Sequence, residues 1–145
     1  MSDTDLVLTR IFDAPRPLVY RAFVDPDQLA QWFGPVGWSV PRDTVTIDAR
    51  AGGAQRFTMV SDDDPTQQSP VDATFVEVVE NELLVGETAA EGERAAMRLR
   101  VEFHDEPGGR TRIVLTQGPY PPEWSGPARQ GWESSFTKLD SLLAR

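Results

Sequence analysis

In residues 14–35 the chain reads Ala14-Pro15-Arg16-Pro17-Leu18-Val19-Tyr20-Arg21-Ala22-Phe23-Val24-Asp25-Pro26-Asp27-Gln28-Leu29-Ala30-Gln31-Trp32-Phe33-Gly34-Pro35. Proline is tolerated in the first turn of a helix, where its missing N–H has no intrahelical partner, so Pro15 and Pro17 predict a helix that runs to about Val24. Asp25 is a typical helix cap, and Pro26 suits the first position of a second helix. Gly34-Pro35 ends that helix. We therefore expect two short helices, the second ending in an aromatic pair.

A first strand precedes these helices, and further strands follow them. Apolar and branched residues fill Leu6 to Phe12, which predicts a strand. From Trp38 to about Gly118 the apolar residues alternate with polar ones, as in strands with one wet face. The alternation predicts six strands with short connections, an antiparallel meander. They cover residues 45–50, 56–59, 71–79, 83–88, 97–104 and 111–117.

A long helix closes the chain. Residues 118–126 hold three prolines, which predicts an irregular loop, and Pro127 is expected to open a helix that runs to about Ala144. Trp132, Phe136, Leu139 and Leu143 recur at helical spacing along it. A curved antiparallel sheet around this helix would bury the apolar face of each. The expected fold is thus α+β: one domain over residues 1–145, with about seven strands wrapped around the C-terminal helix.

Composition excludes several classes of function. The 145 residues carry a formal net charge of -9 and no basic run, which argues against nucleic acid and anionic membranes as partners. No cysteine is present, so neither a disulfide nor a thiolate metal site is expected. No cofactor or metal motif is found. No segment is long and apolar enough to cross a bilayer, and the N-terminus lacks a secretory signal, so a cytoplasmic protein is expected.

Several motifs together resemble one known family. They include Arg10 to Pro15, Asp25-Pro26, Gln31 to Pro35, Arg50 to Gly53, Thr111 to Gln117 and Gly131-Trp132. In this order and spacing the chain is similar to the activator of Hsp90 ATPase homologue family, within the START-like, Bet v 1-like (SRPBCC) helix-grip superfamily. Phe33 departs from the family pattern, in which a second Trp is commoner. The resemblance implies a helix-grip fold with a cavity between sheet and helix, and small relatives that bind apolar molecules.

Aromatic side chains and methionines are the expected lining of that cavity, because ligand pockets prefer apolar walls with few polar groups. The alternative is that the same residues simply fill the core. Tyr120 and Trp124, in the proline-rich segment, are expected to act as a gate. The apolar candidates are Trp32, Phe33, Trp38, Phe57, Met59, Phe75, Met97, Tyr120, Trp124, Trp132 and Phe136.

Polar side chains could orient a ligand, but alternation does not say which face of its strand each occupies. The candidates for this role are Arg56, Thr58, Glu87, His104, Gln117 and Ser135. Arg50, ahead of Gly52-Gly53, is expected to fix the strand turn or to pair with a carboxylate. His104, the only histidine, is expected at the surface.

The sequence leaves three functions open. The first is binding of a small hydrophobic molecule, aromatic or lipid-like, without catalysis. The second is a co-chaperone or other protein-interaction module, and a homodimer also stays open. The third is a cavity enzyme of the cyclase or hydrolase type, for which Arg56, Glu87 and His104 are the only candidate catalytic groups.

Overall fold

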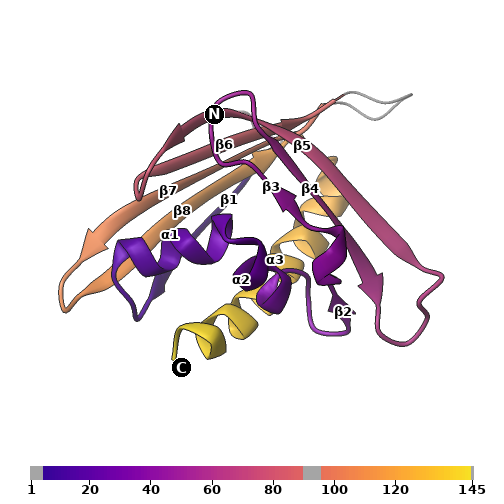
Figure 1. Cartoon of the computed structure of the whole chain (residues 1–145), viewed down its shortest axis with the longest axis horizontal. Coiled ribbons are helices and arrows are strands. Elements are labelled where there is room, and N and C mark those ends of the chain that lie inside the picture. Colours follow the sequence, from indigo (N-terminus) through magenta and orange to yellow (C-terminus); the bar gives the residue numbers. More distant parts are fainter. Residues whose placement is uncertain (1–4, 90–95, 145) are drawn as a thin grey trace.

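A computed structural model describes residues 5–89 and 96–144, and its main feature is one antiparallel sheet curled over a long helix (Figure 1). The strands are β1 (Leu6–Phe12), β2 (Trp38–Ser39), β3 (Thr46–Ile47), β4 (Ala54–Ser61), β5 (Gln68–Val79), β6 (Leu83–Thr88), β7 (Arg98–Glu106) and β8 (Arg110–Gly118). Their order is β1-β8-β7-β6-β5-β4-β2, with β3 also paired to β4. The expected α+β class, with about seven strands around a terminal helix, is confirmed; β2 and β3 are only two residues each.

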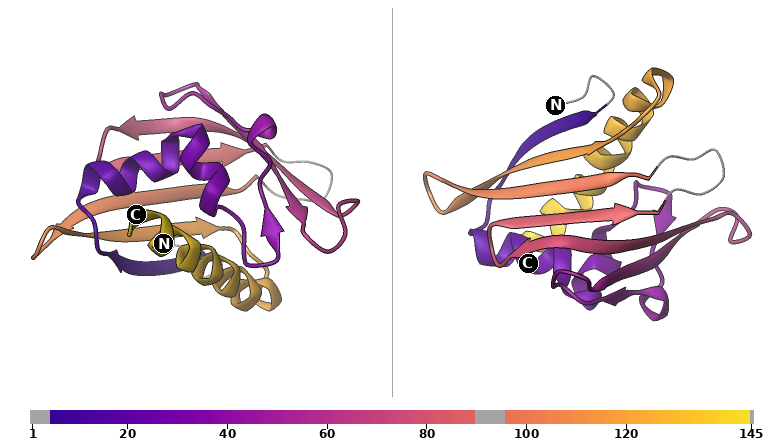
Figure 2. Two further views of the ribbon diagram at one scale, coloured as in Figure 1. Left: turned by 60° about the horizontal axis from the view of Figure 1, so that its bottom comes forward. Right: turned by 90° about the horizontal axis from the view of Figure 1, so that it is seen from above.

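The three α-helices of the described residues lie on the concave face of the sheet (Figure 2). They are α1 (Arg16–Val24), α2 (Pro26–Trp32) and α3 (Pro122–Leu143). At 1.5 Å per residue, α3 is about 33 Å long and crosses the whole sheet. No helix in the described part of the chain could span a membrane.

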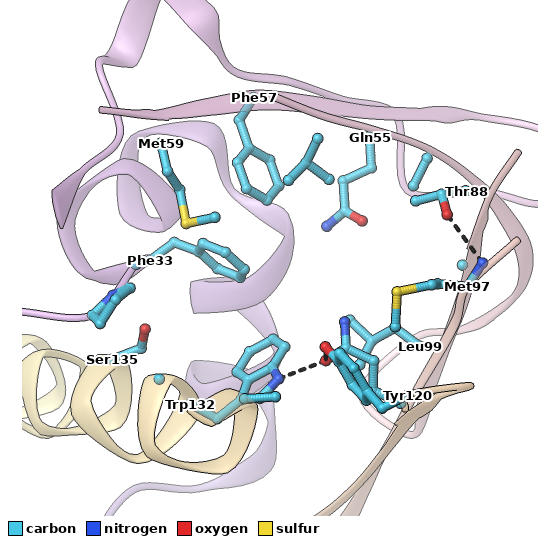
Figure 3. A pocket seen from close by; sticks show the side chains of 18 residues that line it. Phe33, Gln55, Phe57, Met59, Thr88, Met97, Leu99, Tyr120, Trp132 and Ser135 are labelled. Atoms are coloured by element: carbon cyan, nitrogen blue, oxygen red, sulfur yellow. Dashed lines mark hydrogen bonds between the residues drawn. The ribbon is translucent and has the colours of Figure 1, made fainter. Parts of the chain in front are cut away.

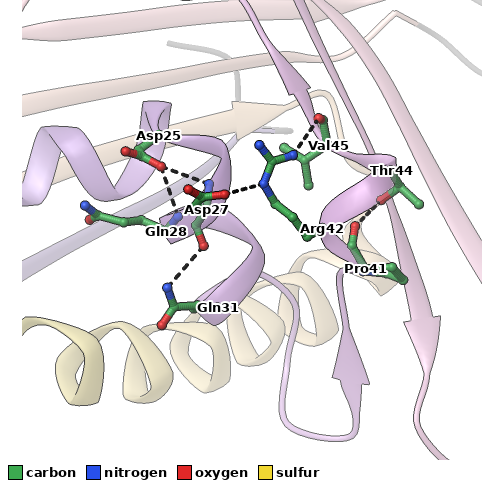
Figure 4. Close-up of polar contacts among 8 residues, drawn as sticks. All are labelled: Asp25, Asp27, Gln28, Gln31, Pro41, Arg42, Thr44 and Val45. Carbon is green, nitrogen blue, oxygen red and sulfur yellow. Dashed lines mark hydrogen bonds and ion pairs between the residues drawn. The ribbon is translucent and has the colours of Figure 1, made fainter.

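Asp25 joins the two short helices as the sequence predicts. Its carboxylate accepts hydrogen bonds from the backbone N–H groups of Asp27 and Gln28, at 2.8 and 3.3 Å (Figure 4). Asp27 in turn pairs with Arg42 of the 3₁₀ turn η1 (Arg42–Thr44), which fixes α2 against the segment before β3. The cap therefore determines where the aromatic pair at the end of α2 is placed.

The start of α3 differs from the prediction. The helix begins at Pro122, so the expected irregular loop over 118–126 is wrong for its second half. Pro121 takes the N-cap position and Pro122 the first turn, where proline does not lose a helical hydrogen bond. Pro127 lies inside the helix and removes one such bond in its second turn. The proline-rich segment is thus a short loop followed by the start of α3.

The core occupies one end of the space between sheet and helices. Phe12, Ile113 and Leu115 of the sheet meet Phe136 and Leu139 of α3, and all five are fully buried. The rings of Phe12 and Phe136 contact edge to face, with centroids 5.2 Å apart. The other end of this space is not filled by side chains.

Candidate functional site

An apolar pocket of about 240 Å³ lies between the N-terminal half of α3 and strands β4 to β8 (Figure 3). It is open to solvent on one side. Inward-facing side chains of the sheet, the segment after α2 and one face of α3 make its walls. They are Phe33, Gly34, Pro35, Gln55, Phe57, Met59, Val71, Ala73, Gly86, Thr88, Met97, Leu99, Gln117, Tyr120, Ala128, Gly131, Trp132 and Ser135.

One wall is aromatic. The ring of Phe33 packs edge to face against Trp132 of α3, with centroids 5.5 Å apart, and against Phe57 of β4, at 4.7 Å. Such pairs orient one another and prefer edge-to-face geometry. Phe33 is the C-cap of α2, so the end of that helix delivers the ring to the pocket. Met59 lies beside it in Figure 3.

Small residues create the space opposite that wall. Gln117, Leu99 and Gly86 are register partners on β8, β7 and β6, so they form one inward-facing row across the sheet. Gly86 contributes no side chain to this row, and its neighbour on the next strand is Phe75, at the edge of a β-bulge. Across the pocket, a Cβ built on Gly131 of α3 would meet no atom within 4 Å. The pocket exists partly because these positions lack side chains.

Gln117 is the centre of a small polar network in the pocket wall. Its Oε1 accepts a hydrogen bond from the Tyr120 hydroxyl at 2.7 Å and another from the Trp132 indole N–H at 2.8 Å. Burial raises the pKa of Tyr120 above 10.0, so the phenol is neutral near pH 7. The network joins the segment before α3 and the middle of α3 to the end of β8.

Six of the eleven apolar candidates line the pocket: Phe33, Phe57, Met59, Met97, Tyr120 and Trp132. Trp32, Phe75 and Phe136 belong to the core instead. Trp32 is 0% exposed. Its indole N–H can be buried in the core because it donates a hydrogen bond to the carbonyl of Ala22 at 2.8 Å. The aromatic pair at the end of α2 is divided: Trp32 packs in the core, and Phe33 forms the pocket wall.

The remaining two tryptophans also lie outside the pocket lining. Trp124 is on the first turn of α3 and 59% exposed, because the helix begins earlier than the sequence predicts. Trp38 is half-buried on β2, where it pairs with Ser61 and its carbonyl accepts a hydrogen bond from Lys138. Both tryptophans were expected to line the cavity, and the structure places both outside the pocket.

Of the polar candidates, only Gln117 and Ser135 line the pocket. Arg56 pairs with Asp72, and Glu87 pairs with Arg98. Successive residues of a strand point to opposite faces of the sheet. Arg56 and Glu87 are each flanked by residues that line the pocket, so both lie on the outer face. His104 pairs with Glu102 at 3.0 Å.

The three candidate catalytic groups therefore do not converge. Arg56, Glu87 and His104 are each engaged on the outer face of the sheet, and none lines the pocket. Thr58 likewise does not line it. Among the described residues, no group of three His, Cys, Asp or Glu side chains could hold a metal ion.

Sequence reasoning missed ten lining residues: Gly34, Pro35, Gln55, Val71, Ala73, Gly86, Thr88, Leu99, Ala128 and Gly131. Strand period could have found some of them, because Gln55 precedes Phe57 by two and Leu99 follows Met97 by two. Ala128 precedes Trp132 by four residues, so the helical period places both on one face of α3. No composition signal distinguishes a small residue beside a cavity from one in a packed core.

Tyr120 also borders a second cavity. This space, of about 250 Å³, lies between the start of β1 and the first turns of α3. Arg129 lines it and donates a hydrogen bond to the carbonyl of Val7 at 2.8 Å. Tyr120 thus lines both cavities, while its expected role as a gate stays a prediction.

Comparison with known proteins places the fold. The family model described as Activator of Hsp90 ATPase homolog 1-like protein matches residues 13–144. Among solved structures, a protein from Nitrosomonas europaea is 25% identical with a TM-score of 0.83, over 99% of this chain and 96% of that one. A protein from Chromobacterium violaceum is 24% identical with a TM-score of 0.85, over 99% of both chains. The AHSA1 protein from Silicibacter pomeroyi is 25% identical with a TM-score of 0.77, over 97% of both. Curated proteins give no match.

Proposed function

We propose that this chain, which belongs to the family of activator of Hsp90 ATPase homolog 1-like proteins, binds a small, largely apolar molecule between α3 and the sheet. The observation that carries the proposal is the pocket of about 240 Å³ with an aromatic wall. Ligand sites are concave and mostly apolar, with a few placed polar groups, and this pocket has that character.

The size of the pocket limits the ligand. It exceeds the roughly 150 Å³ of an apolar cavity that holds benzene, and it lies below the roughly 300 Å³ at which most drug-sized sites begin. A single ring with substituents, or a fused bicyclic molecule with one further ring directed towards the open side, matches that volume and opening. A flat ring would pack against Phe33 and Trp132 in the offset or edge-to-face geometries that aromatic groups favour.

A direct experiment is titration with phenylnaphthylamine, a neutral probe whose fluorescence rises in apolar surroundings. We expect saturable binding and a rise in the melting temperature, because a ligand that binds only the native state stabilises it. Native mass spectrometry of freshly purified protein would identify a molecule that co-purifies. Absence of saturable binding and of any thermal shift, across a panel of neutral mono- and bicyclic aromatic compounds, would contradict the proposal.

A blocked variant separates pocket binding from nonspecific adsorption. In Gly131→Leu the new side chain enters the free space at the pocket wall, so the fluorescence gain should be lost while the protein stays folded. Gln130→Leu is the matched control, because it adds the same side chain at the neighbouring, exposed position of α3. An unchanged fluorescence gain in Gly131→Leu would show that the probe binds elsewhere.

A further inference from the structure

The carboxamide of Gln117 has only one orientation that its neighbours permit. Trp132 Nε1 carries a hydrogen and can only donate, so the atom facing it at 2.8 Å must be the amide oxygen. The same oxygen also accepts from the Tyr120 hydroxyl. A flipped amide would put an NH₂ group against the indole N–H, with no acceptor between them. Two hydrogen bonds therefore fix which end of the amide is which.

The opposite end of this amide is a free donor. Among the described residues Nε2 has no hydrogen-bond partner, and Gln117 lines the pocket. A ligand that displaced water from this wall without offering an acceptor would leave Nε2 unsatisfied, which costs more than the hydrogen bond itself contributes. A ligand with an acceptor at this place avoids that cost.

The other polar groups of the wall are uncharged. Thr88 Oγ1 already accepts from the backbone N–H of Met97 at 3.1 Å, so its hydroxyl hydrogen remains available to donate. Gln55 and Ser135 are neutral as well. No Asp, Glu, Lys, Arg or His lines the pocket within the described residues, so a charged ligand would be buried without a counter-ion, which is costly. The net charge of -9 further disfavours an anion.

We propose that the pocket selects neutral aromatic molecules that carry a carbonyl or a similar hydrogen-bond acceptor, and that Gln117 Nε2 is the donor that recognises it. This inference rests on the proposed function and names the ligand class for the same site. Tyr120 and Trp132 act on recognition through Gln117, because their two hydrogen bonds hold the amide in place.

The test compares two ligands of one shape, acetylnaphthalene and isopropenylnaphthalene with the substituent at the same ring position. They differ in that C=O replaces C=CH₂, and isothermal titration calorimetry gives both dissociation constants. The two ligands also differ in how readily they leave water, and this difference is the same for every protein variant. We therefore compare the ratio of their two dissociation constants in the wild type with the same ratio in each variant. We expect the preference for the ketone to fall about 3- to 10-fold when the donor is removed.

Two variants remove the donor in different ways. Gln117→Met removes the amide altogether. Gln117→Glu in its ionised form keeps an oxygen for Tyr120 and Trp132 but replaces Nε2 by a second oxygen that can only accept. Gln130→Leu is the matched control, since it removes an exposed amide outside the pocket and should leave the ratio unchanged. Gln55→Leu asks whether the other amide of the wall is the donor instead. In infrared spectra, the ketone bound to wild-type protein should show a lower C=O stretching frequency than the ketone bound to Gln117→Met.

The outcomes are distinguishable. If both ligands bind the wild type and the ratio is the same in the Gln117 variants, the role of Gln117 is wrong while the proposed function stands. A fall in the ratio for Gln55→Leu alone would assign the donor to Gln55 and also overturn this inference. If neither ligand binds the wild type up to its solubility limit, the proposed function itself is contradicted.

Discussion

Tyr120 is one of two tyrosines whose hydroxyl pKa is raised in the folded protein. Its hydroxyl donates to Gln117, and burial raises its pKa above 10.0. Burial, with a further contribution from Glu80, also raises the pKa of Tyr20. A raised folded-state pKa means that the native protein holds its protons when the unfolded chain has lost them. The stability that this difference contributes is complete below pH 10 and is lost as the pH rises through the folded pKa.

We therefore expect the ultraviolet absorbance of tyrosinate to appear above pH 10 in the native protein and near pH 10 in denaturant. The chain has two tyrosines, so Tyr120→Phe should remove half of the amplitude and Tyr20→Phe the other half. Unfolding free energy measured in urea should fall as the pH rises beyond 10. A native midpoint equal to that of the denatured chain would show that neither phenol is shielded.

At the scale of elements, α2 depends on its cap. Asp25 satisfies two backbone N–H groups that the helix leaves without intrahelical partners, and the seven-residue helix then delivers Trp32 to the core and Phe33 to the pocket. A helix this short has little stability of its own, so the cap and the tertiary contacts hold it.

Replacement of Asp25 by Ala should lower the unfolding free energy by about 1 kcal/mol, since both N–H groups lose their acceptor. Asp25→Ser keeps a side-chain oxygen and should lose much less. Urea denaturation of the two variants checks the difference. Equal losses would mean that the charge of Asp25, rather than its hydrogen bonds, stabilises α2.

In α3, by contrast, a substitution at Gly131 is expected to raise stability. Glycine in a helix interior is less stable than alanine by roughly 0.5–1 kcal/mol, and a Cβ here meets no atom within 4 Å. Gly131→Ala should therefore raise the melting temperature while removing a little of the pocket. A melting temperature below that of the wild type would indicate that the backbone of α3 is strained at this position.

The architecture was predictable because its signals are periodic. Alternation located the long strands, and helical spacing placed Trp132, Phe136 and Leu139 on the buried face of α3. The pocket was only partly predictable. Periodicity says that Trp32 and Phe33 are both apolar, but the division between core and pocket depends on Ala22, whose carbonyl satisfies the Trp32 indole. The empty volume beside Gly86 and Gly131 is an absence of side chains, which no pattern of apolar residues reports.

On the scale of the whole molecule, stability and binding occupy different ends of one interior. The end beneath α1 and α2 is close-packed around Phe136, which is 0% exposed and contacts the rings of Phe12, Trp32 and Trp132. The other end holds the pocket, where side chains such as Met97 contact empty space on one side. A side chain surrounded by other atoms contributes more dispersion contacts and apolar burial than one that borders a pocket. Truncating a core side chain should therefore cost more unfolding free energy than truncating a pocket side chain.

Phe136→Ala should lower the unfolding free energy by about 3–5 kcal/mol, because it opens a cavity in a packed region. Met97→Ala should cost less than about 2 kcal/mol, since the pocket already leaves that side chain without a full set of neighbours. The binding of phenylnaphthylamine should show the reverse order: weaker in Met97→Ala, and close to wild type in Phe136→Ala at a temperature where that variant is folded. Denaturation in urea and probe titration on the same samples test both statements. Equal stability losses in the two variants would contradict the division, because they would mean that the pocket wall is packed as tightly as the core.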